Sequence, residues 1–389
     1  MQLVLFLGSG ISFPSGLPGV AKITDSVLNE TWFHHTDGRF LQGPPVEFRP
    51  NDPTPILQEF LKRLKPYADL SHPLTGQAGN YEDLFFLAEQ IAADAQSHVD
   101  NPAIGPFVLE LRENTKDLTD RLHKSVGELA NLACDLIRSV AHQKLASVGA
   151  INGLELVESL AISPSIQSLD IVTLNHDLLI ERLLTQRNIT FVDGFGAAEG
   201  NVRYFAPTLF ESRAKVRLFK LHGSINWYRF RGEAQNPFSD RYGIPVHGDP
   251  DHCRDGHRNL LTNIDTIPWI LAGTHGKPIQ YNFGIFAEMH FWFHRLLKEH
   301  DTIAMSGYGW SDRGINGRLI EWLHSSRQPR LLLMHQKLEE LVSYSKGTLW
   351  CRYEPLVKAG RILPIPKWMQ EVTLTDFLAN FGEDKCGRH

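Results

Sequence analysis

Cysteine is scarce in this chain and is never closely paired. The 389 residues include four cysteines and no CxxC pair: Cys134, Cys253, Cys351 and Cys386. This spacing excludes a disulfide framework, and a reducing cytoplasm is the simplest compartment for such a protein.

Long apolar segments and an excess of basic charge are missing as well. No segment is long and apolar enough to span a membrane, and the first apolar run, Leu3 to Leu7, lacks the basic residues that open a signal peptide. The formal net charge of −5 disfavours a nucleic-acid-binding surface that extends over the whole chain. A local basic patch is still compatible with this charge. We therefore expect a cytoplasmic protein with no membrane partner and no direct nucleic-acid binding.

The chain does contain a normal supply of core-forming residues. Hydrophobic residues make up 42% and aromatic residues 10%, which predicts folded domains. Apolar runs alternate with segments of helical spacing, starting with Leu3 to Leu7 and the loop Gly8-Ser9-Gly10. Further strands are expected at 170–174, 216–221, 302–305, 330–334 and 361–365. This alternation predicts an α/β fold with a doubly wound parallel (Rossmann-like) sheet.

A large insertion interrupts the α/β pattern. Residues 32 to 80 are rich in proline and glycine and are expected to form loops with short helices, which could act as a lid. From Tyr81 to about Leu160 the apolar residues recur at helical spacing and predict a helical module. The expected domains are a discontinuous catalytic domain, 1–30 plus 165–382, and a lid with helical insert, 31–164. The charged tail after Gly382 is expected to be disordered.

Two loops are rich in glycine. Gly8-Ser9-Gly10 follows the first strand, and Ser306-Gly307 follows a later one. Either loop could be a bare tight turn, but glycine also lets a phosphate approach the backbone, and a helix N-terminus behind it attracts anions. The first loop lacks the GK[ST] of a P-loop, so ATP hydrolysis by this chain is disfavoured.

Two other loops carry side chains that could perform chemistry. Asn175-His176-Asp177 could be an ordinary helix N-cap. An amide and a carboxylate at the end of a strand also face the crevice where ligands bind in open α/β sheets. His222-Gly223 could likewise be structural, but an imidazole at the sheet edge suits proton transfer near neutral pH.

In this order, the four loops resemble the silent-information-regulator (sirtuin) superfamily. The family's Gly-Ala-Gly-x-Ser and Ser-Gly-Ile-Pro look like Gly8 to Ser12 and Ser15 to Pro18. Its Thr-Gln-Asn-x-Asp looks like Thr173 to Asp177, and its Leu-His-Gly-Ser is present intact as Leu221 to Ser224. Its late Gly-Thr-Ser is similar to Ser306 to Ser311. The resemblance covers about half of the chain, in the blocks 1–28, 165–230 and 300–366.

The resemblance implies NAD⁺ as the substrate and assigns roles to single residues. Asn175 would hold the ribose and a water, Asp177 would engage the nicotinamide carboxamide, and His222 would accept a proton from a ribose hydroxyl or water. The residues implied to surround the pyrophosphate are Gly8, Ser9, Gly10 and Ser12, with Ser306 and Gly307 near the adenosine. The other implied cofactor-binding residues are Pro18, Thr173, Gly223 and Ser224.

Two departures separate this chain from the sirtuin deacylases. Their zinc ribbon has paired CxxC motifs that are absent here, and a long insertion separates the first glycine loop from Asn175. In both features the chain resembles the bacterial sirtuin-like effectors of antiphage defence. These effectors hydrolyse NAD⁺, and some of them work with a HerA-type ATPase. The resemblance therefore implies an NAD⁺ glycohydrolase of abortive infection, a homo-oligomer that needs no metal.

Several alternatives stay open. The chain could be an NAD-dependent protein deacylase, or a non-catalytic NAD or ADP-ribose sensor that regulates a partner. A clustered set of side chains could bind zinc, although its irregular spacing favours a solvated loop: His247, His252, Cys253 and His257. The helical insert could gate the site and mediate self-association, or it could be an elaborated core.

Overall fold

A computed structural model describes residues 1–36, 38–43, 52–70, 78–96, 102–147, 149–232, 239–265, 267–273, 276–345 and 349–382. The chain folds as two compact units. The larger unit comprises Met1–Leu17, Val148–Ile270 and Pro278–His389, and the smaller comprises Pro18–Ser147 and Leu271–Lys277. The sequence analysis placed the corresponding boundaries at 30/31 and 164/165. The tail after Gly382 lies outside the described residues.

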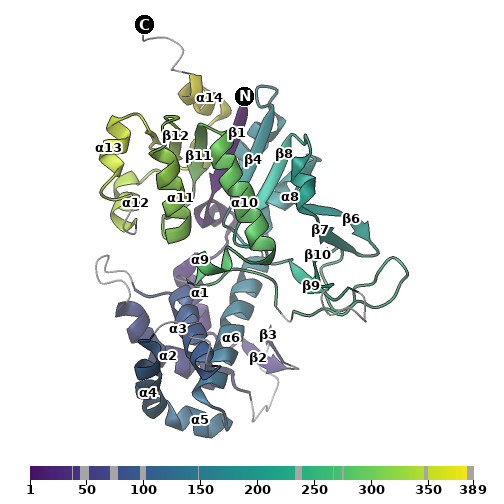
Figure 1. Ribbon diagram of the computed structural model, residues 1–389, viewed down its shortest axis with the longest axis vertical. Helices are drawn as coiled ribbons and strands as arrows, with labels where there is room; N and C mark the ends of the chain where they lie inside the picture. Colours follow the sequence, from purple (N-terminus) through teal and green to yellow (C-terminus); the bar gives the residue numbers. More distant parts are fainter. Residues whose placement is uncertain are drawn as a thin grey trace. The chain divides into compact units, whose positions relative to one another are not determined.

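A seven-stranded parallel sheet forms the centre of the larger unit (Figure 1). Its strand order is β13-β12-β11-β1-β4-β8-β5, and every neighbouring pair is parallel. The strands are β1 (Gln2–Leu7), β4 (Ser168–Thr173), β5 (Phe191–Val192), β8 (Val216–Lys220), β11 (Thr302–Ser306), β12 (Arg330–Met334) and β13 (Ile362–Ile365).

Helices cover both faces of this sheet, and successive side chains of β1 pack against helices on opposite faces. Leu3, Leu5 and Leu7 contribute to a core that they share with α7, α8 and α14. Phe6 points the other way and packs on Phe293 of α10, with the ring centroids 5.6 Å apart. The helices of this unit are α7 (Glu155–Ile162), α8 (Leu179–Gln186), α9 (Lys277–Gln280), α10 (Gly284–Glu299), α11 (Arg313–Leu323), α12 (Leu338–Tyr344), α13 (Tyr353–Lys358) and α14 (Leu374–Gly382).

The strand order reverses direction beside β1. From β1 the chain builds outward through β4 and β8 on one side, then returns to add β11, β12 and β13 on the other. This confirms the predicted doubly wound parallel sheet. In such sheets ligands bind outside the carboxyl ends of the strands at the point of reversal. That point lies between β1 and β11, whose carboxyl ends carry the two glycine loops.

A smaller antiparallel sheet follows α8 within the same unit. Its order is β6-β7-β10-β9, with strands β6 (Phe195–Glu199), β7 (Val202–Phe205), β9 (Tyr228–Phe230) and β10 (Arg241–Pro245). The 3-10 helices of the unit are η1 (Ser9–Ser15), η2 (Pro207–Glu211) and η3 (Met369–Glu371). Among the helices of the described residues, none is long and apolar enough to cross a membrane.

The smaller unit is helical and has its own apolar core. Its helices are α1 (Val20–Asn29), α2 (Thr54–Leu70), α3 (Tyr81–Ala95), α4 (Ile104–Asn114), α5 (Lys116–Leu122) and α6 (Val126–Ala146), beside the hairpin β2 (Phe33–Thr36) and β3 (Arg39–Gln42). The helical module expected from Tyr81 is confirmed for α3 to α6.

The expectation of loops with short helices over residues 32 to 80 is wrong for α2. This helix has 17 residues and buries Leu57, Phe60, Leu61 and Leu64 at helical spacing. Pro55 lies in its first turn, where proline is tolerated, so the proline signal was misleading. The rest of the expected lid includes 44–51 and 71–77, which lie outside the described residues.

A short 3-10 helix separates the first glycine loop from the α-helix that the apolar spacing of Val20, Ile23, Val27 and Leu28 predicts, and that α-helix is confirmed as α1. A short 3-10 helix, η1, follows Gly8 and ends at Gly16, which adopts a left-handed conformation with φ of 81°. The α-helix begins only at Val20, in the smaller unit.

A buried ion pair holds two central strands together. Asp170 of β4 accepts hydrogen bonds from Arg217 of β8 at 2.6 Å and 2.9 Å, and only 1% of the Asp170 side chain is exposed. Removing one partner of a buried pair leaves an uncompensated charge and costs about 3–5 kcal/mol. We expect Asp170→Ala to lower the free energy of unfolding by that amount in urea titrations.

The surface pair of Arg241 and Glu199 is the matched control. It has the same bidentate geometry, at 2.9 Å for both contacts, but both side chains are about half exposed. Because exposed pairs contribute about 0–1 kcal/mol, Glu199→Ala should change stability little. Equal losses in the two variants would contradict the assignment of Asp170 as a buried structural charge.

Candidate active site

The two glycine loops pack against each other through their backbones. Gly8 and Gly10 donate backbone hydrogen bonds to the carbonyls of Ser306 and Gly307, at 3.0 Å and 2.9 Å. A Cβ on Gly8 would lie 2.6 Å from the Gly307 carbonyl oxygen. Glycine is therefore required here for the approach of one loop to the other, and the amides of Gly8 and Gly10 are already engaged.

Gly307 is the most constrained residue of this contact. Its φ is +70°, and a Cβ would lie 2.6 Å from the amide nitrogen of Ile11. We expect Gly307→Ala to lower the free energy of unfolding by about 1–3 kcal/mol, because left-handed strain and overpacking act together. Gly309→Ala is the control in the same loop, since a Cβ there meets nothing within 4 Å. Chemical denaturation of both variants checks this, and equal stabilities would contradict it.

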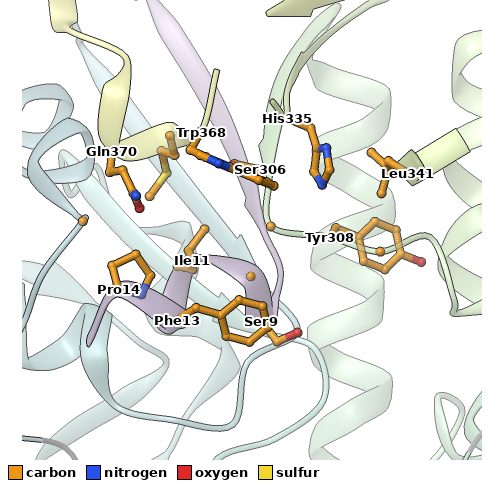
Figure 2. Close-up of a pocket in the computed structure, with 15 residues that line it drawn as sticks. Ser9, Ile11, Phe13, Pro14, Ser306, Tyr308, His335, Leu341, Trp368 and Gln370 are labelled. Carbon is orange, nitrogen blue, oxygen red and sulfur yellow. The ribbon is translucent and has the colours of Figure 1, made fainter. Parts of the chain in front are cut away.

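A cavity of about 500 Å³ lies beside these loops, at the carboxyl ends of β1, β11, β12 and β13. Figure 2 shows Ile11, Phe13 and Pro14 along one side, with Trp368 and Gln370 across from them. The full lining is Ser9, Gly10, Ile11, Phe13, Pro14, Gly153, Ser306, Gly307, Tyr308, Gly309, His335, Leu341, Trp368, Met369 and Gln370. No Lys, Arg, Asp or Glu is among these residues, so the cavity suits a flat, largely uncharged group.

A histidine, His335, lines the cavity. The His335 ring meets the Trp368 ring edge to face, with centroids 4.6 Å apart. Burial lowers the pKa of this histidine below its usual value, which favours the neutral imidazole. The cavity therefore presents a polar, uncharged ring at the end of β12.

Ser12 connects the cavity loop to the Asn175 loop. Its hydroxyl donates to Asp177 Oδ2 at 2.8 Å and accepts from Asn175 Nδ2 at 3.0 Å. Ile11 and Phe13 on either side of it line the cavity. Ser12 thus joins the segment behind β1 to the segment behind β4, and all three polar side chains are buried.

The amide oxygen of Asn175 has no hydrogen-bond partner in the part of the chain that the structure describes. Because Nδ2 is committed to Ser12, Oδ1 points elsewhere, and it is buried without a hydrogen bond among the described residues. An unsatisfied buried acceptor costs about 1–3 kcal/mol, so its presence in a native site calls for a functional explanation. Thr173 sets the loop by accepting the Asn175 amide at 3.0 Å.

His222 lies in a second buried polar cluster. Its Nε2 is 3.1 Å from the Tyr281 hydroxyl and 3.3 Å from Asp312 Oδ2. Tyr281 donates a short hydrogen bond to the same carboxylate oxygen. The Tyr281 ring stacks on His290, with centroids 3.8 Å apart. Burial is the main cause that lowers the pKa of His290 to about 2, and the charge interaction with His222 is the next. His290 therefore stays neutral.

Lys220 ties the loops of the two clusters together. Its buried ammonium donates to the Asp177 carbonyl at 2.5 Å, to Ser224 Oγ at 2.8 Å and to Glu181 at 2.8 Å. Gly223 adopts φ of +82°, and a Cβ there would lie 2.1 Å from the Trp269 carbonyl oxygen. The loop that carries His222 is therefore held rigidly against the loop that carries Asp177.

The structure brings some of the expected site residues together and not others. Ser9, Gly10, Ser306 and Gly307 line the cavity. Asn175, Asp177 and His222 are not among the residues that line it; they are buried, with 6%, 5% and 4% of each residue exposed. Thr173, Gly223 and Ser224 have the structural contacts described above. Pro18 is the first residue of the smaller unit, outside this cluster.

The sequence analysis missed four members of the buried clusters. They are Lys220, Tyr281, His290 and Asp312. Lys220 offered one usable signal, because a lysine at the end of an apolar strand needs a partner. Asp312 has the ordinary role of an N-cap as well, since its Oδ1 accepts the Ile315 amide at 3.0 Å. Tyr281 and His290 gave no local signal, because their partners are distant in the sequence.

The histidine-rich segment was the candidate zinc site in the sequence. Among the described residues, no group of three His, Cys, Asp or Glu side chains could hold a metal ion. Cys253 is buried in the small core beside Tyr204 and Phe230, and burial raises the pKa of its thiol to about 11.

Comparisons with known proteins show little similarity at the sequence level. No known protein family and no curated protein matches this chain. Two solved structures of Sir2 homologues bound to ADP-ribose, a serine-to-alanine and a histidine-to-asparagine mutant, align over 92% of this chain and 92% of theirs. The identities are 14% and 15%, and the TM-score is 0.29 for both. That score is too low to define a shared fold, so the site stands on its own geometry.

The arrangement has the components of a group-transfer site. An uncharged cavity lies at the point of strand reversal, and a hydroxyl, an amide and a carboxylate lead from it into the protein. A buried imidazole with a carboxylate partner supplies a candidate general base.

Proposed function

We propose that this chain binds NAD⁺ at the carboxyl edge of its parallel sheet and hydrolyses the bond between nicotinamide and ribose. Water replaces nicotinamide at the ribose carbon, and the products are nicotinamide, ADP-ribose and one proton. The observation that carries the proposal is the buried amide oxygen of Asn175, which has no hydrogen-bond partner among the described residues. Asn175 is hydrogen-bonded to Ser12, whose neighbours Ile11 and Phe13 line the cavity at the point of strand reversal. Its motif context, Asn175-x-Asp177 followed by Leu221 to Ser224, supports the sirtuin-like assignment.

The cavity supports the binding half of the proposal. Its apolar and aromatic lining suits a purine and ribose, and Ser9 and Ser306 offer hydroxyls for polar contacts. The cavity contains no acidic side chain that would repel a pyrophosphate. We therefore assign the adenosine half of NAD⁺ to this cavity, with Gly10 and Gly307 at its floor.

The two buried clusters support the catalytic half. Loss of nicotinamide leaves a ribose with oxocarbenium character, and an enzyme gains rate by stabilising that charge and placing water opposite the leaving group. In this proposal Asn175 Oδ1 holds the ribose and the water, Asp177 engages the carboxamide, and His222 takes the proton. The Ser12 hydroxyl, through its hydrogen bonds to both, fixes the side chains of Asn175 and Asp177 relative to each other.

The biological setting is part of the proposal as well. We infer a cytoplasmic antiphage effector of the abortive-infection kind, because unrestrained loss of NAD⁺ harms the host. We infer further that the chain self-associates and works with a HerA-type ATPase. Mass measurement in solution, with the chain alone and with a candidate ATPase, tests these inferences. A monomer that never binds the ATPase would contradict them.

Incubation of the purified chain with NAD⁺ separates this function from its rivals. Free nicotinamide and ADP-ribose in equal amounts support hydrolysis. Release of nicotinamide only with an acylated lysine peptide supports a deacylase instead. Binding without release supports a sensor that regulates a partner. ADP-ribose should raise the melting temperature in the first and third cases.

A further inference from the structure

The contacts of His222 define which of its ring nitrogens carries hydrogen. The Tyr281 hydroxyl donates its proton to Asp312 Oδ2, so the phenol oxygen can only accept from another group. Nε2 of His222 therefore faces two acceptors, the phenol oxygen at 3.1 Å and the carboxylate oxygen at 3.3 Å. A ring nitrogen between two acceptors must itself be the donor.

We propose that Asp312 and Tyr281 are positioning residues that hold His222 as the Nε2–H tautomer, so that Nδ1 accepts the proton in catalysis. This inference rests on the proposed function for its kinetic part only. When Nδ1 takes a proton from water or a ribose hydroxyl, that O–H bond breaks, an N–H bond forms and the ring becomes an imidazolium. The Asp312 carboxylate then lies beside the positive charge and stabilises it.

Both positioning residues are themselves fixed from several sides. Asp312 begins α11, where Oδ1 accepts the Ile315 amide at 3.0 Å and leaves Oδ2 for the cluster. The Tyr308 hydroxyl donates to the Asp312 carbonyl at 3.2 Å, and Tyr308 lines the cavity. The Tyr281 ring lies against the rings of His222 and His290, nearly parallel to both.

The neutral state of His290 completes the electrostatic argument. Burial holds the pKa of His290 near 2, so this ring does not compete with His222 for the Asp312 charge. Arg318 contacts His290 Nδ1 at 3.2 Å and supplies the nearby fixed cation. The Asp312 carboxylate therefore has one ionisable imidazole beside it, that of His222, and it also interacts with the charge of Arg318.

Two variants test the inference by kinetics. Asp312→Asn keeps an N-cap side chain but removes the charge, and we expect kcat for NAD⁺ cleavage to fall by about 10²–10⁴-fold with little change in KM. Tyr281→Phe keeps the carboxylate and should lower kcat by up to about tenfold. Tyr67→Phe is the matched control in the smaller unit, where the hydroxyl donates to Glu110 at 3.2 Å, and it should cleave NAD⁺ at the normal rate.

A spectroscopic test does not depend on activity. In ¹⁵N-histidine-labelled protein, the His222 signals, assigned by their loss in His222→Gln, should show the Nε2–H tautomer in the unmodified chain and in Tyr281→Phe. Asp312→Asn should change that tautomer. An Nδ1–H tautomer in the unmodified chain, or normal kcat in Asp312→Asn, would overturn the inference. If the unmodified chain releases no nicotinamide, the proposed function fails and the tautomer alone decides the positioning role.

Discussion

Replacement of His222 by alanine is expected to abolish NAD⁺ cleavage while the fold persists. General base catalysis contributes about 10²–10⁴-fold to a rate, so the loss of the imidazole should bring turnover below detection. The fold should persist because Tyr281 and Asp312 remain hydrogen-bonded to each other. Nicotinamide release by chromatography measures the first effect, and thermal unfolding measures the second.

His252→Ala is the matched control for His222→Ala. His252 also contacts a carboxylate, with Nδ1 at 2.6 Å from Asp249 Oδ2, but its side chain is 83% exposed. The account predicts normal turnover for this variant. Normal turnover by His222→Ala would contradict the catalytic role of that residue. Loss of turnover in His252→Ala would favour the zinc alternative for the histidine-rich segment.

Replacement of Asn175 by alanine is expected to abolish cleavage without loss of stability. The variant removes one hydrogen bond to Ser12, but it also removes a buried oxygen that has no partner. The two effects oppose each other, so the free energy of unfolding should change by less than about 1 kcal/mol. Activity should vanish because nothing replaces Oδ1 at the ribose and the water. Parallel NAD⁺ assays and urea titrations give both quantities.

Asn29→Ala provides the control for a lost amide contact. Asn29 donates to Asp25 at 2.8 Å on the exposed face of α1 and has no place in the proposed site. This variant should keep both activity and stability. A large loss of stability in Asn175→Ala would instead show that Asn175 is a structural cap, the ordinary interpretation of its motif.

The strands were predictable from the sequence because their signal is local. A continuous apolar run such as Leu3 to Leu7 is typical of a buried parallel strand, and the structure confirms it as β1. The positions of the loops at the carboxyl ends of the strands were predictable as well, because each loop begins where an apolar run ends. The α2 helix was missed because its prolines suggested loops, although its apolar residues recur at helical spacing.

The cluster around His222 was not predictable, because its members come from distant parts of the chain. Tyr281 precedes α10, and Asp312 opens α11 behind β11. Only the crossing of the chain to the far side of β1 brings these loops to the same edge. The reason for the glycines was also hidden: Gly8 and Gly307 are small because they touch each other, which no single loop reveals.

The most direct test of the account is the release of nicotinamide from NAD⁺ by the purified chain in the absence of any acylated peptide. The account predicts nicotinamide and ADP-ribose in equal amounts from the unmodified chain, and neither product from Asn175→Ala or His222→Ala. Intact NAD⁺ after incubation with the unmodified chain, or equal product from all three proteins, would contradict it.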